Sequence, residues 1–438
     1  MTSVCIEGHN LSLPTGSGIA TYGRTLLDGM RAIGVGGQVL HAPPGPVPGD
    51  PLLREILTAD ARWKHMAALR SPRPNRRVQA ALARFGRTAH YVAPTGATLW
   101  PEHSQPPRVE AYWLSQDLFR IANRAFNNDR VMTPIRFDPD RLAPDAMHWT
   151  CPTPLKSRSG PNIYTIHDLI PLKLPHTTLD DKRRFLDLCR RIVRDADHIV
   201  TVSDTTRADV IQMLGADERR ITTTWQSADL PATVLDRPEG EVAAEIEGAF
   251  ALPWKGYFVH FGAIEPKKNL GRLIEAYLRS GSRTPLVVIG AKAWMAEKES
   301  GFLTELIADG WGAGGRLRKY DYMPRGVLLD LVRGAKATLF PSLYEGFGLP
   351  VLESMMLGTP VLASRAGSLP EIASDAALLV DPYDIDEMAK GLRLLDSDTD
   401  MLGELSQLGR VRAANFSPSA YAERLRTLYR DIGVMPGP

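Results

Sequence analysis

The chain has 438 residues, of which 44% are hydrophobic, and its 52 basic residues nearly balance its 50 acidic ones. This length predicts two or three domains, and the near-neutral charge gives no reason to expect nucleic acid as a partner. Three widely spaced cysteines argue against disulfides and zinc sites. Because no apolar run reaches the roughly 18 residues of a spanning helix and the N-terminus has no signal-peptide pattern, we expect a cytoplasmic protein.

Short apolar runs alternate with helical patterns along most of the chain, which predicts β–α repeats and parallel sheets. In the first half, strands are expected at 4–7, 162–166 and 198–202, and helices at 21–33, 180–196 and 204–214. The stretch 41–150 is rich in proline and less regular. We expect insertions around fewer strands there.

In the second half, strands are expected at 257–261, 286–289, 317–320 and 337–341, and helices at 270–279, 327–333 and 421–432. The polar, acidic segment 231–253 is the expected linker. These patterns predict two α/β domains, 1–245 and 246–415, and a terminal helical segment, 416–438. Two such domains imply a cleft, and ligands of such sheets bind at the carboxyl ends of the strands.

The most informative segment runs from Leu343 to Glu353 and reads LYEGFGLPVLE. It follows an expected strand, and Pro350 lies where a helix can begin. Gly346 and Gly348 let backbone N–H groups approach a ligand, and N–H groups at a helix N-terminus favour phosphate. Glu345 and Glu353 flank this turn. Because carboxylates beside a phosphate site need another ligand, sugar hydroxyls are the natural candidates.

This segment resembles the E-x7-E motif of the retaining glycosyltransferases with the GT-B fold, in particular family four. Glutamates at this spacing alone are compatible with structural roles, because Glu353 falls in the first turn of the expected helix, where an acid is favourable. The likeness continues in MMLGTPVLAS at 355–364, GSLPEI at 367–372 and ALLVDP at 377–382. It is strong from about 255 to 385, moderate at 1–35 and 160–215, and not evident across 41–150.

The resemblance implies an α/β protein of the GT-B type, with two Rossmann-like α/β/α domains facing a cleft and a C-terminal helix that crosses back to the first domain. The donor would bind to the second domain, and the first would select the acceptor. Glu353 would bind the ribose hydroxyls, and Glu345 the hydroxyls of the transferred sugar. Backbone N–H groups would come from Phe347, Gly348 and Leu349, and the base pocket would be lined by Tyr322 and Met323.

The segment GAIEPKKN at 262–269 follows an expected strand and opens a helix. Cations at a helix N-terminus oppose the dipole, which suggests an anion that offsets the cost. The segment resembles the family's G-x-x-x-P-R/K-K-N motif, which assigns the donor diphosphate to Lys268 and places Asn269 in the donor site. Ala263 stands where many members have arginine or threonine, so the missing contact is expected from Arg24, Lys267 or Arg365.

Two features of the first domain complete the predicted site. GSGIATY at 16–22 departs from the dinucleotide fingerprint, because Thr21 stands at the third glycine. It resembles the family's N-terminal glycine loop, from which Gly18 is carried over to the donor site. His167 and Asp168 end an expected strand, where family four often has histidine near the transferred sugar. The resemblance implies that His167 binds a sugar hydroxyl or stabilises charge at the anomeric carbon, and that Asp168 orients it or touches the acceptor.

Three D-x-D triplets, at 138–140, 384–386 and 396–398, fit the metal signature of other glycosyltransferases. Each lies in a polar, turn-prone setting and is expected to be solvated. No metal or other cofactor is expected, because Lys268 and the helix at Leu349 can carry the diphosphate charge.

Segments TIHDLIP at 165–171 and IEPKKN at 264–269 look most like those of bacterial mannosyltransferases of surface-polysaccharide assembly. We therefore expect a retaining hexosyltransferase that acts by front-face substitution. GDP-mannose or a related GDP-hexose is the favoured donor, with UDP- and dTDP-sugars open, and the acceptor is a glycan or a polyprenyl-diphosphate-linked glycan. A sugar-nucleotide epimerase and a non-catalytic sugar-nucleotide-binding protein are the alternatives, with a nicotinamide dehydrogenase third.

Basic and apolar residues interleave at 62–87, with no acidic residue there. This pattern predicts a solvated basic loop with arginine-rich helices or, alternatively, an amphipathic surface for anionic lipid, at about 1 kcal/mol per basic residue. The second interpretation would place the protein at the inner face of the plasma membrane.

Overall fold

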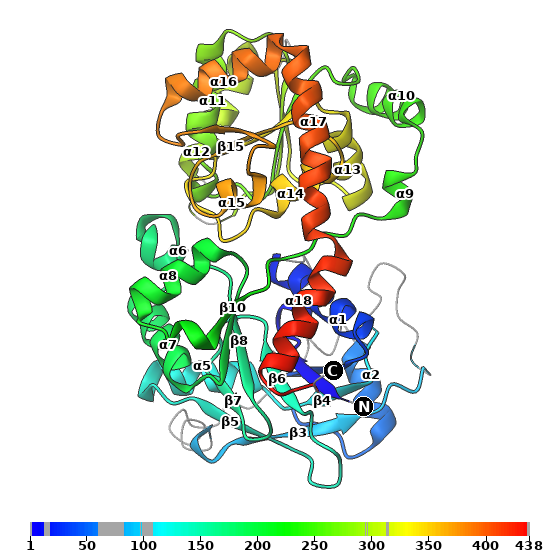
Figure 1. Ribbon diagram of the computed structural model, residues 1–438, viewed down its shortest axis with the longest axis vertical. Helices are drawn as coiled ribbons and strands as arrows, with labels where there is room; N and C mark the ends of the chain where they lie inside the picture. The colour runs from blue at the N-terminus through cyan, green and yellow to red at the C-terminus, as the bar shows by residue number, and fades with distance from the viewer. Residues whose placement is uncertain are drawn as a thin grey trace.

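A computed structural model describes residues 2–12, 18–59, 83–96, 98, 108–293, 295, 297–311 and 315–435. It contains two α/β domains, each built around its own sheet, stacked along the long axis of the molecule (Figure 1). The expected two-domain arrangement is confirmed. Across the described ranges, no helix combines the length and the apolar character needed to span a membrane. Most of the basic segment at 62–87 lies outside the described residues.

The first sheet has ten strands in the order β10-β9-β8-β6-β1-β2-β4-β3-β5-β7. All its pairings are parallel except that of β3 with β4. The strands are β1 Ser3–Glu7, β2 Gly36–His41, β3 Arg87–Val92, β4 Ala111–Leu114, β5 Thr133–Phe137, β6 Ala146–Trp149, β7 Leu155–Ser157, β8 Asn162–Ile166, β9 His198–Thr201 and β10 Ile221–Thr223.

The stretch 41–150 is more regular than expected, because it supplies β3, β4, β5 and β6. The expectation of fewer strands was wrong there, since these strands are short and prolines flank or interrupt them, which hides their pattern. The helices of this domain are α1 Gly18–Ala32, α2 Pro51–Ala59, α5 Leu118–Asp129, α6 Ile170–Lys173, α7 Lys182–Asp195 and α8 Asp204–Leu214. Ser203 caps α8 by accepting from the N–H of Thr206.

The second sheet is wholly parallel, in the order β13-β12-β11-β14-β15-β16. Its strands are β11 Phe258–Phe261, β12 Leu286–Ile289, β13 Leu317–Tyr320, β14 Ala337–Phe340, β15 Val361–Ser364 and β16 Leu378–Val380. Strands covered on both faces read as continuous apolar runs, and this explains why β12, all of whose residues are buried, matches its predicted bounds. The edge strand β13, with the sequence LRKY, also matches its predicted bounds. The helices are α11 Leu270–Ser280, α12 Glu297–Leu306, α13 Arg325–Gly334, α14 Leu349–Met356, α15 Leu369–Ala373 and α16 Ile385–Ser397.

The segment 231–253 contains two helices, α9 Ala232–Leu235 and α10 Glu239–Phe250. The prediction that this segment is a simple linker was therefore wrong. Val242 and Ile246, one turn apart on α10, are buried in the same cluster as the strand β11. The other residues of α10 include four glutamates and two glycines, which gave the segment the composition of a linker. The hydrophobic core of the second domain therefore includes residues from Leu230 onward.

The terminal helices join the domains. Helix α17 Thr399–Ala413 belongs to the second domain, and α18 Pro418–Asp431 crosses to lie on α1 (Figure 1). The approach is close, since a Cβ placed on Gly29 of α1 would lie 2.7 Å from Leu425. Tyr421 and Leu425 are buried in one apolar cluster with Tyr22, which confirms the crossover.

Candidate active site

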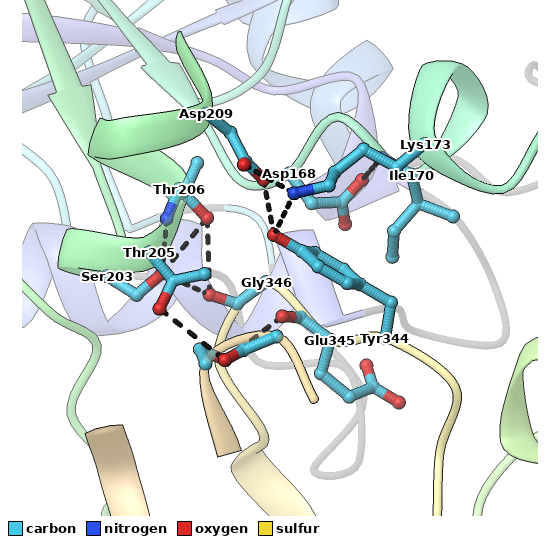
Figure 2. Close-up of polar contacts among 12 residues, drawn as sticks. Asp168, Ile170, Lys173, Ser203, Thr205, Thr206, Asp209, Tyr344, Glu345 and Gly346 are labelled. Carbon is cyan, nitrogen blue, oxygen red and sulfur yellow. Dashed lines mark hydrogen bonds and ion pairs between the residues drawn. The ribbon is translucent and has the colours of Figure 1, made fainter. Parts of the chain in front are cut away.

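The carboxyl ends of the two sheets meet where the loop after β14 contacts the end of β8. A Cβ on Gly346 would lie 2.1 Å from the carbonyl oxygen of His167, so a side chain is sterically excluded. Ser203 donates a hydrogen bond to the carbonyl of Gly346 at 2.7 Å (Figure 2). Thr206 donates to the carbonyl of His167 at 3.0 Å. Gly346 therefore serves the contact between the two domains.

Lys268 and Glu345, both predicted to lie in the donor site, form a buried ion pair in this region. Lys268 ends a 3₁₀ turn after β11, and its Nζ lies 2.6 Å from Oε1 of Glu345. The Nζ of Lys267 lies 4.0 Å from the other carboxylate oxygen and 3.4 Å from Glu265. The loop therefore concentrates two ammonium groups and two carboxylates between β11 and β14.

Opposing effects set the protonation of this cluster. Burial raises the pKa of Glu345, but the positive charges of Lys268 and Lys267 lower it by a larger amount. The pKa of Glu345 therefore lies below its ordinary value. Burial lowers the pKa of Lys267, but Glu345 and Glu265 raise it more, so it stays protonated. The site therefore carries fixed positive charge beside a glutamate that remains ionised at neutral pH.

Helix α14 begins beside this cluster. Its N-cap, Gly348, has φ 108°, in the left-handed region that favours glycine. Among the described residues, none accepts a hydrogen bond from the backbone N–H of Phe347, Gly348 or Leu349. The ring of Phe347 packs on Phe416, and Leu349 is partly buried. These donors lie at the positive end of the helix dipole, as an anion site requires.

Glu353 belongs to the second turn of α14 rather than the first, so the helix dipole alone does not explain its position. Both its oxygens accept from Arg325, at 3.1 and 2.5 Å. The Glu353 side chain is 9% exposed and that of Arg325 is 49% exposed. Tyr322 is highly exposed and Met323 is partly buried, both just before Arg325. Arg325 was not predicted, although a cation at the N-terminus of a helix was a usable signal.

The imidazole of His167 is held by two neutral partners. Its Nε2 donates to the carbonyl of Thr150 at 2.7 Å, and Gln226 donates to Nδ1 at 3.2 Å. Burial lowers the pKa of His167, and the bond to Thr150 and the charge of Asp168 offset this only in part. One of the two roles predicted for Asp168 was to orient this ring. Both ring nitrogens have other partners, and Oδ1 of Asp168 accepts from the N–H of Ile170 instead.

A buried carboxylate anchors the same strand ends. Glu7, the last residue of β1, accepts from the N–H and the hydroxyl of Thr150 at 2.7 and 2.5 Å. The ring of Tyr22 lies edge-on to His167, with 4.9 Å between centroids. Gln226, Thr150 and Glu7 lie far from His167 in the sequence, and no local motif marked them.

Other predicted residues take supporting positions. Asn269 is 1% exposed, and its amide donates to the carbonyls of Pro341 and Pro382 at 3.0 and 2.7 Å, which ties together the loops after β14 and β16. Gly18 begins α1 and is exposed, directly after residues 13–17, which lie outside the described ranges. Ala263 is exposed. Three residues were predicted to supply the contact that Ala263 lacks: Arg24, Lys267 and Arg365. Arg24 is exposed on α1, and Arg365 pairs with Glu387. Of the three, Lys267 is the one beside Glu345.

The D-x-D triplets have structural partners. Asp384 and Asp398 cap α16 and α17, and Asp396 accepts from Ser282, Thr284 and Lys336. Asp138 accepts from the N–H of Tyr91. Within the described ranges, no group of three or more histidine, cysteine or acidic side chains is arranged to hold a metal ion.

Two facing α/β domains with charged residues at opposed strand ends are the arrangement of the GT-B fold, and comparison with known proteins agrees. The family model "Glycosyl transferases group 1" matches residues 250–412, and "Glycosyltransferase Family 4" matches residues 75–229. The second match includes residues 75–150, where the motifs gave no evident resemblance to the family. A sucrose-phosphate synthase from Thermosynechococcus elongatus has the same fold, with a TM-score of 0.66 at 16% identity over 99% of both chains.

The chain belongs to glycosyltransferase family four and is similar to its mannosyltransferases. It is 31% identical over 273 residues to the O-antigen chain mannosyltransferase B of Escherichia coli, covering 59% of this chain and 70% of the relative. It is 30% identical to a D-inositol 3-phosphate glycosyltransferase of Salinispora arenicola, covering 65% of this chain and 66% of the relative.

Proposed function

We propose that the protein transfers a mannose-like hexose from a GDP-hexose, with retention, to a glycan or a polyprenyl-diphosphate-linked glycan in surface-polysaccharide assembly. The observation that carries this proposal is the Lys267–Lys268–Glu345 cluster beside the N-terminus of α14. It combines cations and backbone donors for a diphosphate with a carboxylate for sugar hydroxyls. The named O-antigen mannosyltransferase relative supports the choice of sugar.

Each group has a role in this proposal. Lys268, Lys267 and the N–H groups of Phe347, Gly348 and Leu349 stabilise the charge that develops on the leaving diphosphate. Glu345 binds the hexose and Glu353 the ribose. The acceptor hydroxyl attacks from the side that the diphosphate leaves, and a phosphate oxygen takes its proton. His167 is neutral, so it acts through hydrogen bonding, and one of its two present bonds must be exchanged for a sugar hydroxyl.

A thermal-shift screen across GDP-, UDP-, dTDP- and ADP-sugars tests the donor, because a ligand that binds the folded state raises the melting temperature. We expect GDP-mannose to give the largest shift. The screen needs no acceptor, and a Glu353→Gln variant is the matched control that should lose most of the shift. If another nucleotide gives the larger shift, the donor assignment is wrong.

Retention and independence of metal are tested on the product. We expect the anomeric configuration of the transferred hexose, read by NMR, to match that of the donor, and transfer to continue at an undiminished rate in EDTA. An inverted product would contradict the front-face mechanism. Loss of activity in EDTA that Mg²⁺ or Mn²⁺ restores would contradict the assignment of the diphosphate charge to lysines.

The epimerase alternative predicts a changed sugar nucleotide when the acceptor is absent, and the binding-protein alternative predicts no turnover at all. Chromatography of the nucleotide products separates these outcomes from transfer.

We further propose that the segment 62–87 brings the protein to anionic lipid at the cytoplasmic face of the membrane. Sedimentation with phosphatidylserine vesicles that falls as salt rises would support this contact, and absence of binding at any salt concentration would exclude it.

A further inference from the structure

Three side chains from the two domains bind one another next to Glu345 (Figure 2). Lys173 ends α6 and Asp209 lies in α8, both in the first domain, whereas Tyr344 directly precedes Glu345 in the second. The Nζ of Lys173 donates to Oδ1 of Asp209 at 2.5 Å and to the hydroxyl of Tyr344 at 3.2 Å. The hydroxyl of Tyr344 in turn donates to Oδ2 of Asp209. The three groups form a closed triad.

The triad is largely shielded from water. The side chain of Asp209 is 8% exposed and that of Lys173 is 31% exposed. The Lys173 Nζ also lies 4.6 Å from the centroid of the Tyr344 ring. Burial, together with the bond to Asp209, raises the pKa of Tyr344, so its hydroxyl stays protonated. A shielded ion pair depends on further hydrogen bonds, and here Tyr344 of the opposite domain supplies them.

Both neighbours of Glu345 in the chain are therefore held by the first domain. Tyr344 is held by the Lys173–Asp209 pair, and the carbonyl of Gly346 by Ser203 at 2.7 Å. The Glu345 carboxylate itself is held by Lys268 of the second domain. The position of this side chain thus depends on contacts with both domains.

We propose that Lys173, Asp209 and Tyr344 are positioning residues for the transfer reaction, which place Glu345 to hold the hexose only while the two domains are in contact. This inference rests on the proposed function. The cationic cluster and α14, which would bind the diphosphate, belong to the second domain alone. Loss of the triad should therefore slow turnover without weakening the binding of the nucleotide.

The test uses Tyr344→Phe, which removes one oxygen atom, and Asp209→Asn. We expect each variant of the full chain to lower kcat at least tenfold, while the donor KM and the thermal shift with GDP stay within twofold of wild type. The double variant should be no slower than the slower single variant, because both act through one contact. Asp187→Asn is the control: it breaks a pair with Arg130 at 2.8 Å within the first domain and should leave kcat unchanged.

Hydrogen exchange of the peptide 343–347 gives a readout that needs no activity. Both triad variants should exchange faster there, and Asp187→Asn should match wild type. Wild-type kcat in Tyr344→Phe, multiplicative losses in the double variant, or unchanged exchange at 343–347 would each overturn the inference. If wild type transfers no hexose from any nucleotide sugar, the proposed function fails, and the exchange result alone then decides whether the triad fixes the loop.

Discussion

The Lys268–Glu345 pair holds opposite charges 2.6 Å apart with both side chains about nine-tenths buried. In such surroundings charge interactions are stronger than in water, so the pair would act on the diphosphate and hexose of a bound donor with little loss to solvent. We expect Lys268→Ala and Glu345→Ala each to lower turnover more than tenfold, which is at least about 1.4 kcal/mol in the barrier. Steady-state rates, with circular dichroism to verify folding, provide the measurement.

Lys390→Ala, on the exposed face of α16, is the matched control for the removal of a lysine. It should keep the wild-type rate. Near-normal rates for both site variants would refute the assigned roles, whereas a rate loss in Lys390→Ala would show that the assay responds to net charge alone.

Arg325 has a separate role, because it binds both oxygens of Glu353. A bidentate guanidinium fixes a carboxylate in one plane, and two further lone pairs remain for ribose hydroxyls. Arg325→Lys should therefore raise the donor KM about tenfold, the equivalent of losing one charge-assisted hydrogen bond, with kcat changed less than twofold. Initial rates over a range of donor concentrations measure both constants. A fall in kcat at constant KM would mean that Arg325 acts on the reacting centre instead.

Most of the site residues that the sequence predicts stand in short local patterns: the glycine turn at Gly348, the segment at 262–269 and the strand end at His167. The missed residues act across long sequence distances. Arg325 meets Glu353 over a separation of 28 residues, and Gln226 meets His167 over 59. Such contacts depend on which strands become neighbours. A single sequence carries no signal for that choice, although it marks each strand end.

At the scale of elements, the loop between β14 and α14 is defined by steric limits on both sides. Gly346→Ala would place a methyl group 2.1 Å from the His167 carbonyl, and this backbone oxygen cannot move without displacing the end of β8. We expect this variant to unfold at a lower temperature, by an amount equivalent to about 1–3 kcal/mol for overpacking, and to lose most of its transfer activity. Differential scanning calorimetry and rate assays measure the two effects.

Gly403→Ala is the control for that substitution. Gly403 lies in α17 with no heavy atom within 4 Å of an added Cβ, so alanine should be neutral or stabilise the helix by up to about 1 kcal/mol. Equal melting temperatures for Gly346→Ala and wild type would mean that the two domains do not touch at this loop in solution.

Elements with strong local signals were predicted well, and those defined by tertiary packing were not. The capped helix α8 and the apolar strand β12 match their predicted bounds. Helix α10 was missed because only Val242 and Ile246 bury deeply, too few to produce a clear apolar period. The antiparallel pairing of β3 with β4 was missed because the repeat pattern elsewhere favours parallel strands.

At the scale of the whole molecule, the two domains are joined by contacts of different kinds. Glu371 of α15 accepts from the N–H groups of Asp204 and Thr205 at the start of α8, at 2.7 and 3.0 Å, and from the indole of Trp225 at 2.7 Å. This carboxylate lies at the positive end of a helix in the other domain. The apolar contact of α18 with α1 adds a second, non-directional attachment. The first contact is made of directional hydrogen bonds, whereas the second is mainly apolar.

Buried histidines in both domains make the stability of the whole molecule depend on pH. Burial lowers the pKa of His148, under α18, to about 3, and that of His260, in β11, to about 4, against 6.5 when exposed. Between pH 6.5 and 4 the unfolded chain therefore binds two more protons at these sites, and stability falls on acidification by up to about 1.4 kcal/mol per histidine and pH unit. Glu7 acts oppositely, because burial raises its pKa from 4.5 to about 7.

Among the described residues, five histidines have a lowered pKa and three carboxyl groups a raised one, so we expect wild type to unfold at a lower urea concentration at pH 5.5 than at pH 7.5. His148→Gln removes one titrating group and should reduce that difference, whereas Glu7→Gln removes the opposing group and should enlarge it. Urea unfolding followed by tryptophan fluorescence at both pH values measures these changes. Greater resistance to urea at pH 5.5 would mean that the histidines are accessible to protons in the folded state, and that α18 does not seal His148 against the first sheet.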